Sequence, residues 1–70
     1  MRHSKVSPRE HEVLELIAHE YTSKEIAHRL YISTHTVLSH RKNLYEKLGV
    51  KNTAGMIRSA FECGLLPLTN

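Results

Sequence analysis

A single cysteine, Cys63, occurs among the 70 residues, so no disulfide can form within the chain. This excludes the small secreted scaffolds that several disulfides hold together. No apolar run approaches the roughly 18 residues that indicate a membrane span. The first residues, MRHSKVSPREHE, carry positive charges without the hydrophobic segment that follows them in a signal peptide. We therefore expect a cytoplasmic protein that contacts no membrane.

The short chain limits both the architecture and the chemistry of the protein. Seventy residues provide one small hydrophobic core, and the sequence contains no repeat, low-complexity segment or linker. A pocket for a small substrate typically occupies about 300–1,000 Å³ and needs a supporting shell, which is difficult to build at this size. We expect one domain over residues 1–70, with its core in 7–66 and tails at 1–6 and 67–70. We expect neither a cofactor nor enzymatic activity.

Helix start and stop signals divide the chain into four segments. SPRE (7–10) and TSKE (22–25) each place a hydroxyl residue three positions before a glutamate, which is the pattern of a capping box. Ser33 can cap a third segment, and Gly49 suits the left-handed position that ends a helix. Apolar residues recur at helical spacing, and no stretch alternates with the period of a strand. The pattern predicts an all-α four-helix bundle with helices over about 8–19, 23–30, 34–48 and 53–63.

The positive charge is concentrated in one part of the chain. The formal net charge of +3 comes wholly from residues 34–53, which hold four bases against Glu46, while residues 1–33 and 54–70 are each neutral. The connection before this segment, YIS (31–33), is short enough to force a sharp crossing of the helices on either side. A basic helix after such a turn is typical of a helix-turn-helix, whose second helix can enter the major groove of DNA. The third helix is therefore the candidate DNA-reading element.

Four stretches of sequence cover nearly the whole chain in a specific order. They are SPREHEVLELIA (7–18), TSKEIAHRLYIS (22–33), HTVLSHRKNLYEKLGV (35–50) and GLL (64–66). Together they resemble the LuxR-type (also called GerE- or FixJ-type) C-terminal helix-turn-helix domain of bacterial transcription regulators. The resemblance implies sequence-specific binding to double-stranded DNA through the third helix, with dimerisation through the fourth on a two-fold symmetric site. RNA polymerase is a second partner that the resemblance implies, and the bacterial nucleoid is the location.

The resemblance also implies roles for individual positions of this sequence. Base-reading positions fall on Leu38, Ser39 and Lys42. Positions that contact phosphates are the polar and basic ones around the same helix, namely Lys24, Ser33, Thr34, His35, Thr36, Arg41, Lys47, Lys51 and Thr53. Dimer contacts on the fourth helix fall on Met56, Ser59 and Cys63.

Three positions depart from the family pattern. Leu38 stands where lysine is common, so it can touch a thymine methyl group but cannot make a bidentate hydrogen bond to guanine. Glu20 replaces the glycine that usually ends the first helix, so we expect this corner to be closed differently. Thr53 replaces a common arginine at the start of the fourth helix, which weakens one phosphate or structural contact.

Two other functions fit parts of the pattern. Region four of sigma factors shares much of the REHEVL and KEIA patterning, but the LGVKN segment followed by a complete fourth helix argues against that assignment. A protein-interaction module would use exposed apolar residues of the fourth helix. In that helix we expect Ile57, Ala60 and Phe61 to face inward and Met56 to be exposed. Phe61 is a second candidate for the exposed surface that would bind a partner. Such a module would need no basic third helix.

The histidines and tyrosines indicate no further chemistry. His35 and His40 are five residues apart, a spacing that does not align two metal ligands on one helix face, so no metal site is expected. His40 is instead expected to be partly buried. Tyr21 and Tyr31 are expected to pack at helix ends. Tyr45 can either touch a phosphate or cover the core with its hydroxyl in water, and we favour the second position.

Overall fold

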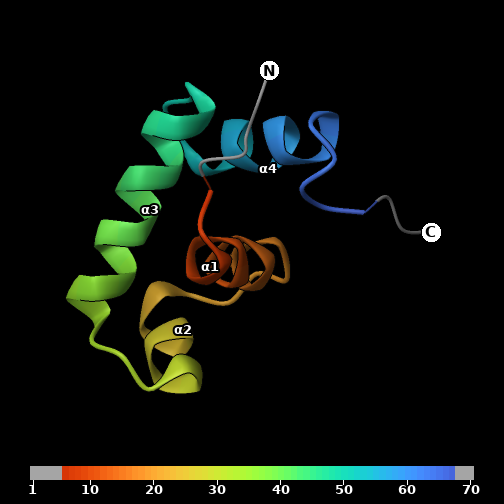
Figure 1. The fold of residues 1–70 in the computed structure, drawn as a ribbon. Coiled ribbons are helices and arrows are strands. Elements are labelled where there is room, and N and C mark those ends of the chain that lie inside the picture. The colour runs from red at the N-terminus through yellow and green to blue at the C-terminus, as the bar shows by residue number, and fades with distance from the viewer. Residues whose placement is uncertain (1–5, 68–70) are drawn as a thin grey trace.

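The computed structural model describes residues 6–67, which form four helices joined by three short connections (Figure 1). The predicted tails at 1–6 and 67–70 lie outside the described residues, apart from Val6 and Pro67. No strand occurs within residues 6–67. The predicted all-α architecture is therefore confirmed, and each helix boundary lies within one residue of its expected position. The helices are α1 (Pro8–Ala18), α2 (Ser23–Leu30), α3 (Thr34–Leu48) and α4 (Thr53–Glu62).

Each helix begins at a side chain that satisfies a backbone N–H group of its first turn. The Ser7 hydroxyl accepts from the Glu10 N–H at 3.1 Å, and the Glu10 carboxylate accepts from the Ser7 N–H at 3.0 Å. Thr22 and Glu25 form the same reciprocal pair at 3.1 and 2.8 Å. The first residues of each segment thus determine where its helix starts. The caps of α3 and α4 are the side chains of Ser33 and Asn52.

The corners after α1 and α2 are closed by residues other than glycine. Glu20 has φ 68° and Tyr31 has φ 59°, both in the left-handed region. The expectation that Glu20 changes the first corner is wrong, because Glu20 adopts the conformation that a glycine would take. Backbone hydrogen bonds from Glu20 to Ile17 and from Tyr21 to Leu16 close the turn and hold it there. A side chain in this conformation costs roughly 1–2 kcal/mol.

Replacing Glu20 by glycine should therefore stabilise the domain. The substitution relieves the left-handed strain, but glycine also gains about 0.5–1 kcal/mol of conformational freedom in the unfolded chain, so the net gain is up to about 1 kcal/mol. We expect the thermal midpoint to rise by up to about 4–8 °C. Glu20→Ala keeps the Cβ atom and removes the carboxylate, so its midpoint should stay close to that of the original chain. A midpoint that falls with glycine would contradict strain at this corner.

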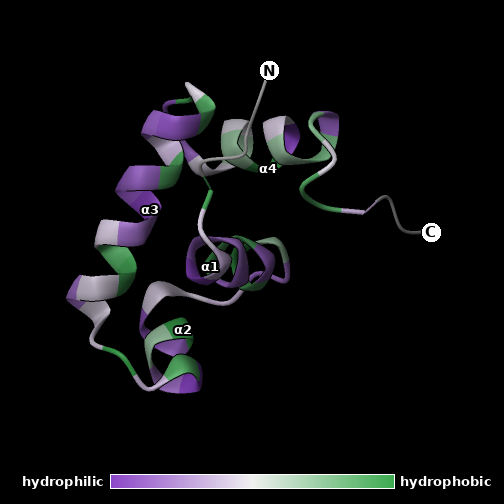
Figure 2. Ribbon diagram, in the orientation of Figure 1, coloured by the Kyte–Doolittle hydropathy of each residue, from purple (hydrophilic) through white to green (hydrophobic). Residues whose placement is uncertain are grey.

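The hydrophobic core lies where the inner faces of the four helices meet. Hydrophilic residues follow much of the outer surface of α3 in Figure 2, whereas apolar residues line the side towards the other helices. Beyond α4 the chain turns back, so that Leu66 is buried and the Leu65 carbonyl accepts a hydrogen bond from His11 Nε2 at 2.7 Å. Within residues 6–67, no helix has both the length and the apolar character that a membrane crossing requires. The largest fully buried side chains are Val13, Leu14, Ile26, Val37, Leu44 and Met56.

The expectation that Met56 is exposed on α4 is wrong. Its relative exposure is 0%, and the buried face of α4 consists of Met56 and Ala60, one helical turn apart. Ile57 and Phe61 are only partly buried at the edge of this face. Both pairs are apolar and share the same spacing, so helical periodicity does not distinguish them. Met56 therefore belongs to the core and offers no surface for the expected dimer contact.

Candidate nucleic-acid interface

Helices α2 and α3 form a tight pair around the three-residue connection 31–33. The Ile32 N–H donates to the Ala27 carbonyl at 3.0 Å, and the left-handed backbone of Tyr31 reverses the chain between the helices. Ala27 and Val37 are buried where α2 and α3 approach one another. The other three helices lie on one side of α3, which leaves its opposite side open along the edge of the molecule (Figure 1). This arrangement is a helix-turn-helix with an accessible second helix.

The open side of α3 carries all three residues predicted to read bases. Leu38, Ser39 and Lys42 are exposed, and Leu38 retains 51% of its accessible surface. Positions 38 and 42 are one helical turn apart, so both can approach the same groove. Lys42 is the only cation of the three, whereas Leu38 offers an apolar surface. The exposed strip therefore combines one long donor with a side chain suited to a thymine methyl group.

The first turn of α3 adds hydrogen-bond donors next to this strip. The Ser33 hydroxyl accepts from the Thr36 N–H at 3.0 Å and lies 2.9 Å from the Thr36 hydroxyl. Thr34 and His35 are exposed beside them. Backbone N–H groups at the start of a helix lack partners within the helix and favour a negatively charged ligand. This end of α3 is therefore chemically suited to a phosphate.

Arg41 lies in a hydrogen-bonded cluster between α3 and α4. Its Nη2 atom donates to the Thr53 hydroxyl at 2.7 Å and, more weakly, to the Tyr45 hydroxyl at 3.4 Å. The two hydroxyl oxygens are 3.2 Å apart. The hydrogen bond to Thr53, aided by Arg41, holds the pKa of Tyr45 below its usual 10.0 even though burial raises it. The Tyr45 hydroxyl, expected in water, lies within hydrogen-bond reach of Arg41 and Thr53 in a partly buried position.

Lys47 is paired with a carboxylate at the start of α1. Its Nζ atom donates to Glu10 Oε1 at 2.7 Å, and only 6% of the Glu10 side chain is exposed. Burial alone raises the pKa of Glu10. The hydrogen bonds from Lys47, the Ser7 backbone and Asn43, with the charge of Lys47, outweigh burial and place this pKa below its usual 4.5. Lys47, expected at a phosphate, therefore has a structural partner that ties α3 to α1.

Comparison with known proteins identifies the family. A family profile described as "Bacterial regulatory proteins, luxR family" matches residues 4–60. The chain belongs to the LuxR family. This confirms the predicted resemblance, and the α2–α3 unit is the helix-turn-helix of a LuxR-family domain.

Individual relatives agree with the family assignment. The LuxR-family chain is 46% identical over 61 residues to the transcriptional regulatory protein MctR of Rhizobium johnstonii. It is 41% identical over 61 residues to the oxygen regulatory protein NreC of Staphylococcus aureus. Each alignment covers 87% of this chain and 28% of the relative. The chain thus spans just over a quarter of the length of these curated relatives.

Solved structures show the same fold. The transcription factor GerE superposes with a TM-score of 0.83 at 34% identity, covering 87% of this chain and 91% of GerE. The response regulator ChrA of a heme-sensing two-component system superposes with a TM-score of 0.84 at 34% identity, covering 87% of this chain and 30% of ChrA. The four-helix arrangement is therefore that of the LuxR family.

Other cations of this LuxR-family domain remain accessible. Lys24 at the start of α2, Lys42 on α3 and Lys51 before α4 are exposed, and none has an ion-pair partner among residues 6–67. This distinguishes them from Lys47. An exposed ammonium group can exchange its water for a phosphate oxygen at little desolvation cost.

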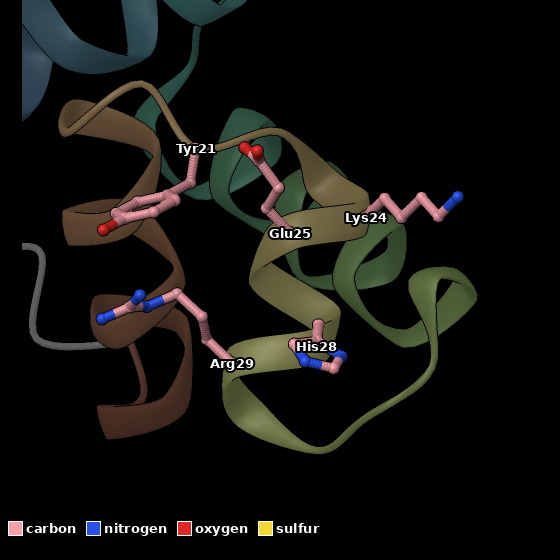
Figure 3. A pocket seen from close by; sticks show the side chains of 5 residues that line it. All are labelled: Tyr21, Lys24, Glu25, His28 and Arg29. Atoms are coloured by element: carbon pink, nitrogen blue, oxygen red, sulfur yellow. The ribbon is translucent and has the colours of Figure 1, made fainter.

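Sequence reasoning gave no role to a shallow depression on the face of α2 directed away from α3. Figure 3 shows Tyr21, Lys24, Glu25, His28 and Arg29 around it, with Lys24 pointing away from Tyr21 and Arg29. The Arg29 guanidinium lies 4.6 Å from the centre of the Tyr21 ring, a cation–π contact. Tyr21 packs at the end of α1 as predicted, whereas Tyr31 is 94% exposed and does not pack. The Glu25 carboxylate is already engaged as a helix cap.

Within the part of the chain that the structure describes, the histidines form no cluster of three or more with other ligand-type residues. His40 is partly buried as predicted, and its Nδ1 atom is buried with no hydrogen-bond partner among the described residues. His35 is exposed on α3. Across residues 6–67, no group of three or more histidine, cysteine, aspartate or glutamate side chains is arranged to hold a metal ion.

Proposed function

We propose that this LuxR-family domain binds double-stranded DNA sequence-specifically by placing α3 in the major groove. The observation that carries the proposal is the open side of α3, where Leu38, Ser39 and Lys42 are exposed on the helix that follows a sharp turn. The formal charge surplus of the chain lies in the same segment, residues 34–53. A regulator of this kind needs no chemical step, because its function is the binding itself.

Affinity and specificity would come from different side chains. In the proposed complex, the first turn of α3 and the exposed lysines Lys24 and Lys51 contact phosphates and fix the position of the domain on the duplex. Lys42 and Ser39 donate hydrogen bonds to base edges, and Leu38 contacts a thymine methyl group. Lys47 is not among the proposed phosphate contacts, because its ammonium group is paired with the Glu10 carboxylate.

We further propose that two copies bind a two-fold symmetric site through α4. With Met56 in the core, the candidate contacts on this helix are Ser59 and Cys63, which are partly buried with Oγ and Sγ 3.8 Å apart. A symmetric dimer would place two copies of α3 in successive major grooves, so its site would contain two related half-sites. RNA polymerase would be a second partner, and a chromosomal target would place the protein at the bacterial nucleoid.

Selection of random DNA duplexes on the purified 70-residue chain tests this function. We expect a single enriched motif with two inverted half-sites, and an affinity that falls steeply with salt because cation–phosphate contacts release counterions. Enrichment of one unrepeated half-site would support DNA binding and contradict the dimer. The absence of any enriched motif, with an affinity that is insensitive to salt, would overturn the DNA-binding proposal itself.

Lys42→Ala should weaken binding to the preferred site by about 2 kcal/mol, which is roughly a 30-fold rise in Kd. The loss should be confined to the selected sequence, because a base contact contributes little on random DNA. Lys51→Ala is the matched control, since it removes the same charge from a proposed phosphate contact. It should weaken binding to both DNAs alike and lower the salt slope by about 0.9. A uniform loss with Lys42→Ala would place that residue at a phosphate instead.

A further inference from the structure

The guanidinium of Arg41 is held in place by neutral groups only. Thr53 and Tyr45 accept hydrogen bonds from its Nη2 atom, at 2.7 and 3.4 Å. Both acceptors are hydroxyl oxygens, and Arg41 makes no ion pair with a carboxylate within residues 6–67. A partly buried cation therefore has its orientation fixed while its charge remains uncompensated. In this respect Arg41 differs from Lys47, whose charge is balanced by Glu10.

Part of the hydrogen-bonding capacity of Arg41 is also unused. A guanidinium carries five N–H groups, and the two on Nη2 suffice for the bonds to Thr53 and Tyr45. The groups on Nη1 and Nε have no hydrogen-bond partner among the described residues. Arginine with a fixed plane and free donors is well suited to a tetrahedral oxyanion, which can accept two parallel N–H bonds. An anion would therefore complement this cluster in both charge and hydrogen bonding.

The position of the cluster favours a phosphate of bound DNA as that anion. Arg41 lies three residues after Leu38 and directly before Lys42, so it flanks the exposed strip of α3 on the side of α4. Exposed Lys51 lies in the connection that leads to Thr53. The cluster therefore lies where a DNA backbone would run beside an α3 helix inserted in the major groove.

We propose that Arg41 binds a DNA phosphate and that Tyr45 and Thr53 are positioning residues that orient its guanidinium without touching the phosphate. This inference rests on the proposed DNA-binding function and goes further by changing the role of Thr53 from a phosphate contact to a support for Arg41. The hydroxyls reduce the freedom that the arginine side chain would otherwise lose on binding. They also connect the DNA-reading helix to α4, the proposed dimer element.

A double-mutant cycle on DNA affinity tests the positioning role. Arg41→Ala should weaken binding about 10-fold and lower the salt slope by about 0.9, because one phosphate contact is lost. Thr53→Val, which removes the hydroxyl at nearly constant volume, should weaken binding about 3- to 10-fold, and Thr53→Ser should restore it. Tyr45→Phe should have a smaller effect, in keeping with its longer hydrogen bond. In the Arg41→Ala background, Thr53→Val should have no further effect.

The outcomes separate this inference from the proposed function. If Thr53→Val weakens binding equally with and without Arg41, Thr53 contacts the phosphate itself and the positioning role is wrong. If Arg41→Ala leaves the salt slope unchanged while the original chain binds DNA, the phosphate assignment is wrong and the proposed function stands. If the original chain shows no salt-dependent DNA binding, both the proposed function and this inference are wrong. Arg9→Ala, a charge-matched change on α1, should leave the affinity nearly unchanged, and thermal melts establish that each variant is folded.

Discussion

Replacing Met56 by alanine should lower the free energy of unfolding by about 3–4 kcal/mol. The side chain is fully buried in the apolar core, so its truncation removes apolar contacts and leaves a cavity that the surrounding residues fill only in part. A domain of this size has a total stability of roughly 4–10 kcal/mol, so the substitution removes a large part of it. Urea unfolding of the purified chain, followed by circular dichroism, measures the change.

Leu38→Ala provides the matched control for this substitution. It shortens a large apolar side chain by a similar amount, but Leu38 is 51% exposed on α3. The free energy of unfolding of the Leu38→Ala variant should therefore differ from that of the original chain by less than about 0.5 kcal/mol. The affinity of this variant for the selected DNA site should fall. A similarly small effect of Met56→Ala on stability, combined with weaker dimerisation, would contradict the buried position and return Met56 to the surface of α4.

Replacing Lys47 by methionine should destabilise the domain by about 3 kcal/mol at neutral pH. The substitution keeps most of the aliphatic stem and removes the cation that faces the buried carboxylate of Glu10. Removing one partner of a buried ion pair leaves the other charge without compensation, and this typically costs about 3–5 kcal/mol. We expect the lower end of that range because 32% of the Lys47 side chain is exposed. Chemical unfolding at pH 7 provides the measurement.

The effect of Lys47→Met should disappear in acid. In the original chain the pKa of Glu10 is lower when the protein is folded than when it is unfolded, so the ionised carboxylate stabilises the fold above the unfolded value of about 4.5. This contribution is lost as the pH falls through the folded pKa, because both states are then protonated. Once the carboxyl group is neutral it no longer needs the cation, so the stabilities of the two chains should converge as the pH falls below the folded pKa of Glu10.

The exposed pair Arg58–Glu62 gives the control for the Lys47 experiment. Its side chains retain 81% and 65% of their accessible surface, and a surface pair of this kind contributes about 0–0.5 kcal/mol. Arg58→Met should therefore have little effect at any pH. A Lys47→Met variant that behaves like Arg58→Met would show that Glu10 is sufficiently stabilised by Ser7 and Asn43 alone.

Features set by neighbouring residues could be predicted from the sequence. Ser7 with Glu10, and Thr22 with Glu25, are three residues apart, so their capping boxes depend on local geometry alone. Gly49 at φ 67° ends α3 as expected because a left-handed cap strongly favours glycine. With these signals and the helical spacing of apolar residues, the number, limits and order of the helices follow directly.

Features that depend on distant residues could not be predicted. Glu10 and Lys47 are 37 positions apart, and nothing near Glu10 indicates that its carboxylate is buried against α3. The rotation of α4 about its axis is set by packing. No local feature of the sequence therefore indicated that Met56 would be fully buried and Phe61 only partly buried. Tyr31 was expected to pack at a helix end, but its left-handed backbone directs the side chain into solvent.

The candidate site was predictable in its position but only partly in its detail. The exposed residues of α3 follow from helical geometry once the core face is known, so the exposed strip of this helix could be located in advance. The arrangement of Arg41, Tyr45 and Thr53 depends on where α4 begins relative to α3, which is a tertiary property. In our proposal, that arrangement makes Thr53 a support for Arg41 and adds Tyr45 to the site.

The capping of every helix by its own first residues has a consequence for how fast the domain folds. The connections 19–22, 31–33 and 49–52 are short, so consecutive helices meet without the entropy cost of closing a long loop. Each helix can begin to form from its own cap before the core assembles, and most native contacts then join residues near one another in the chain. Proteins with such local contacts fold within about microseconds to milliseconds. A molecule that unfolds by chance would thus regain its shape far faster than a cell could replace it.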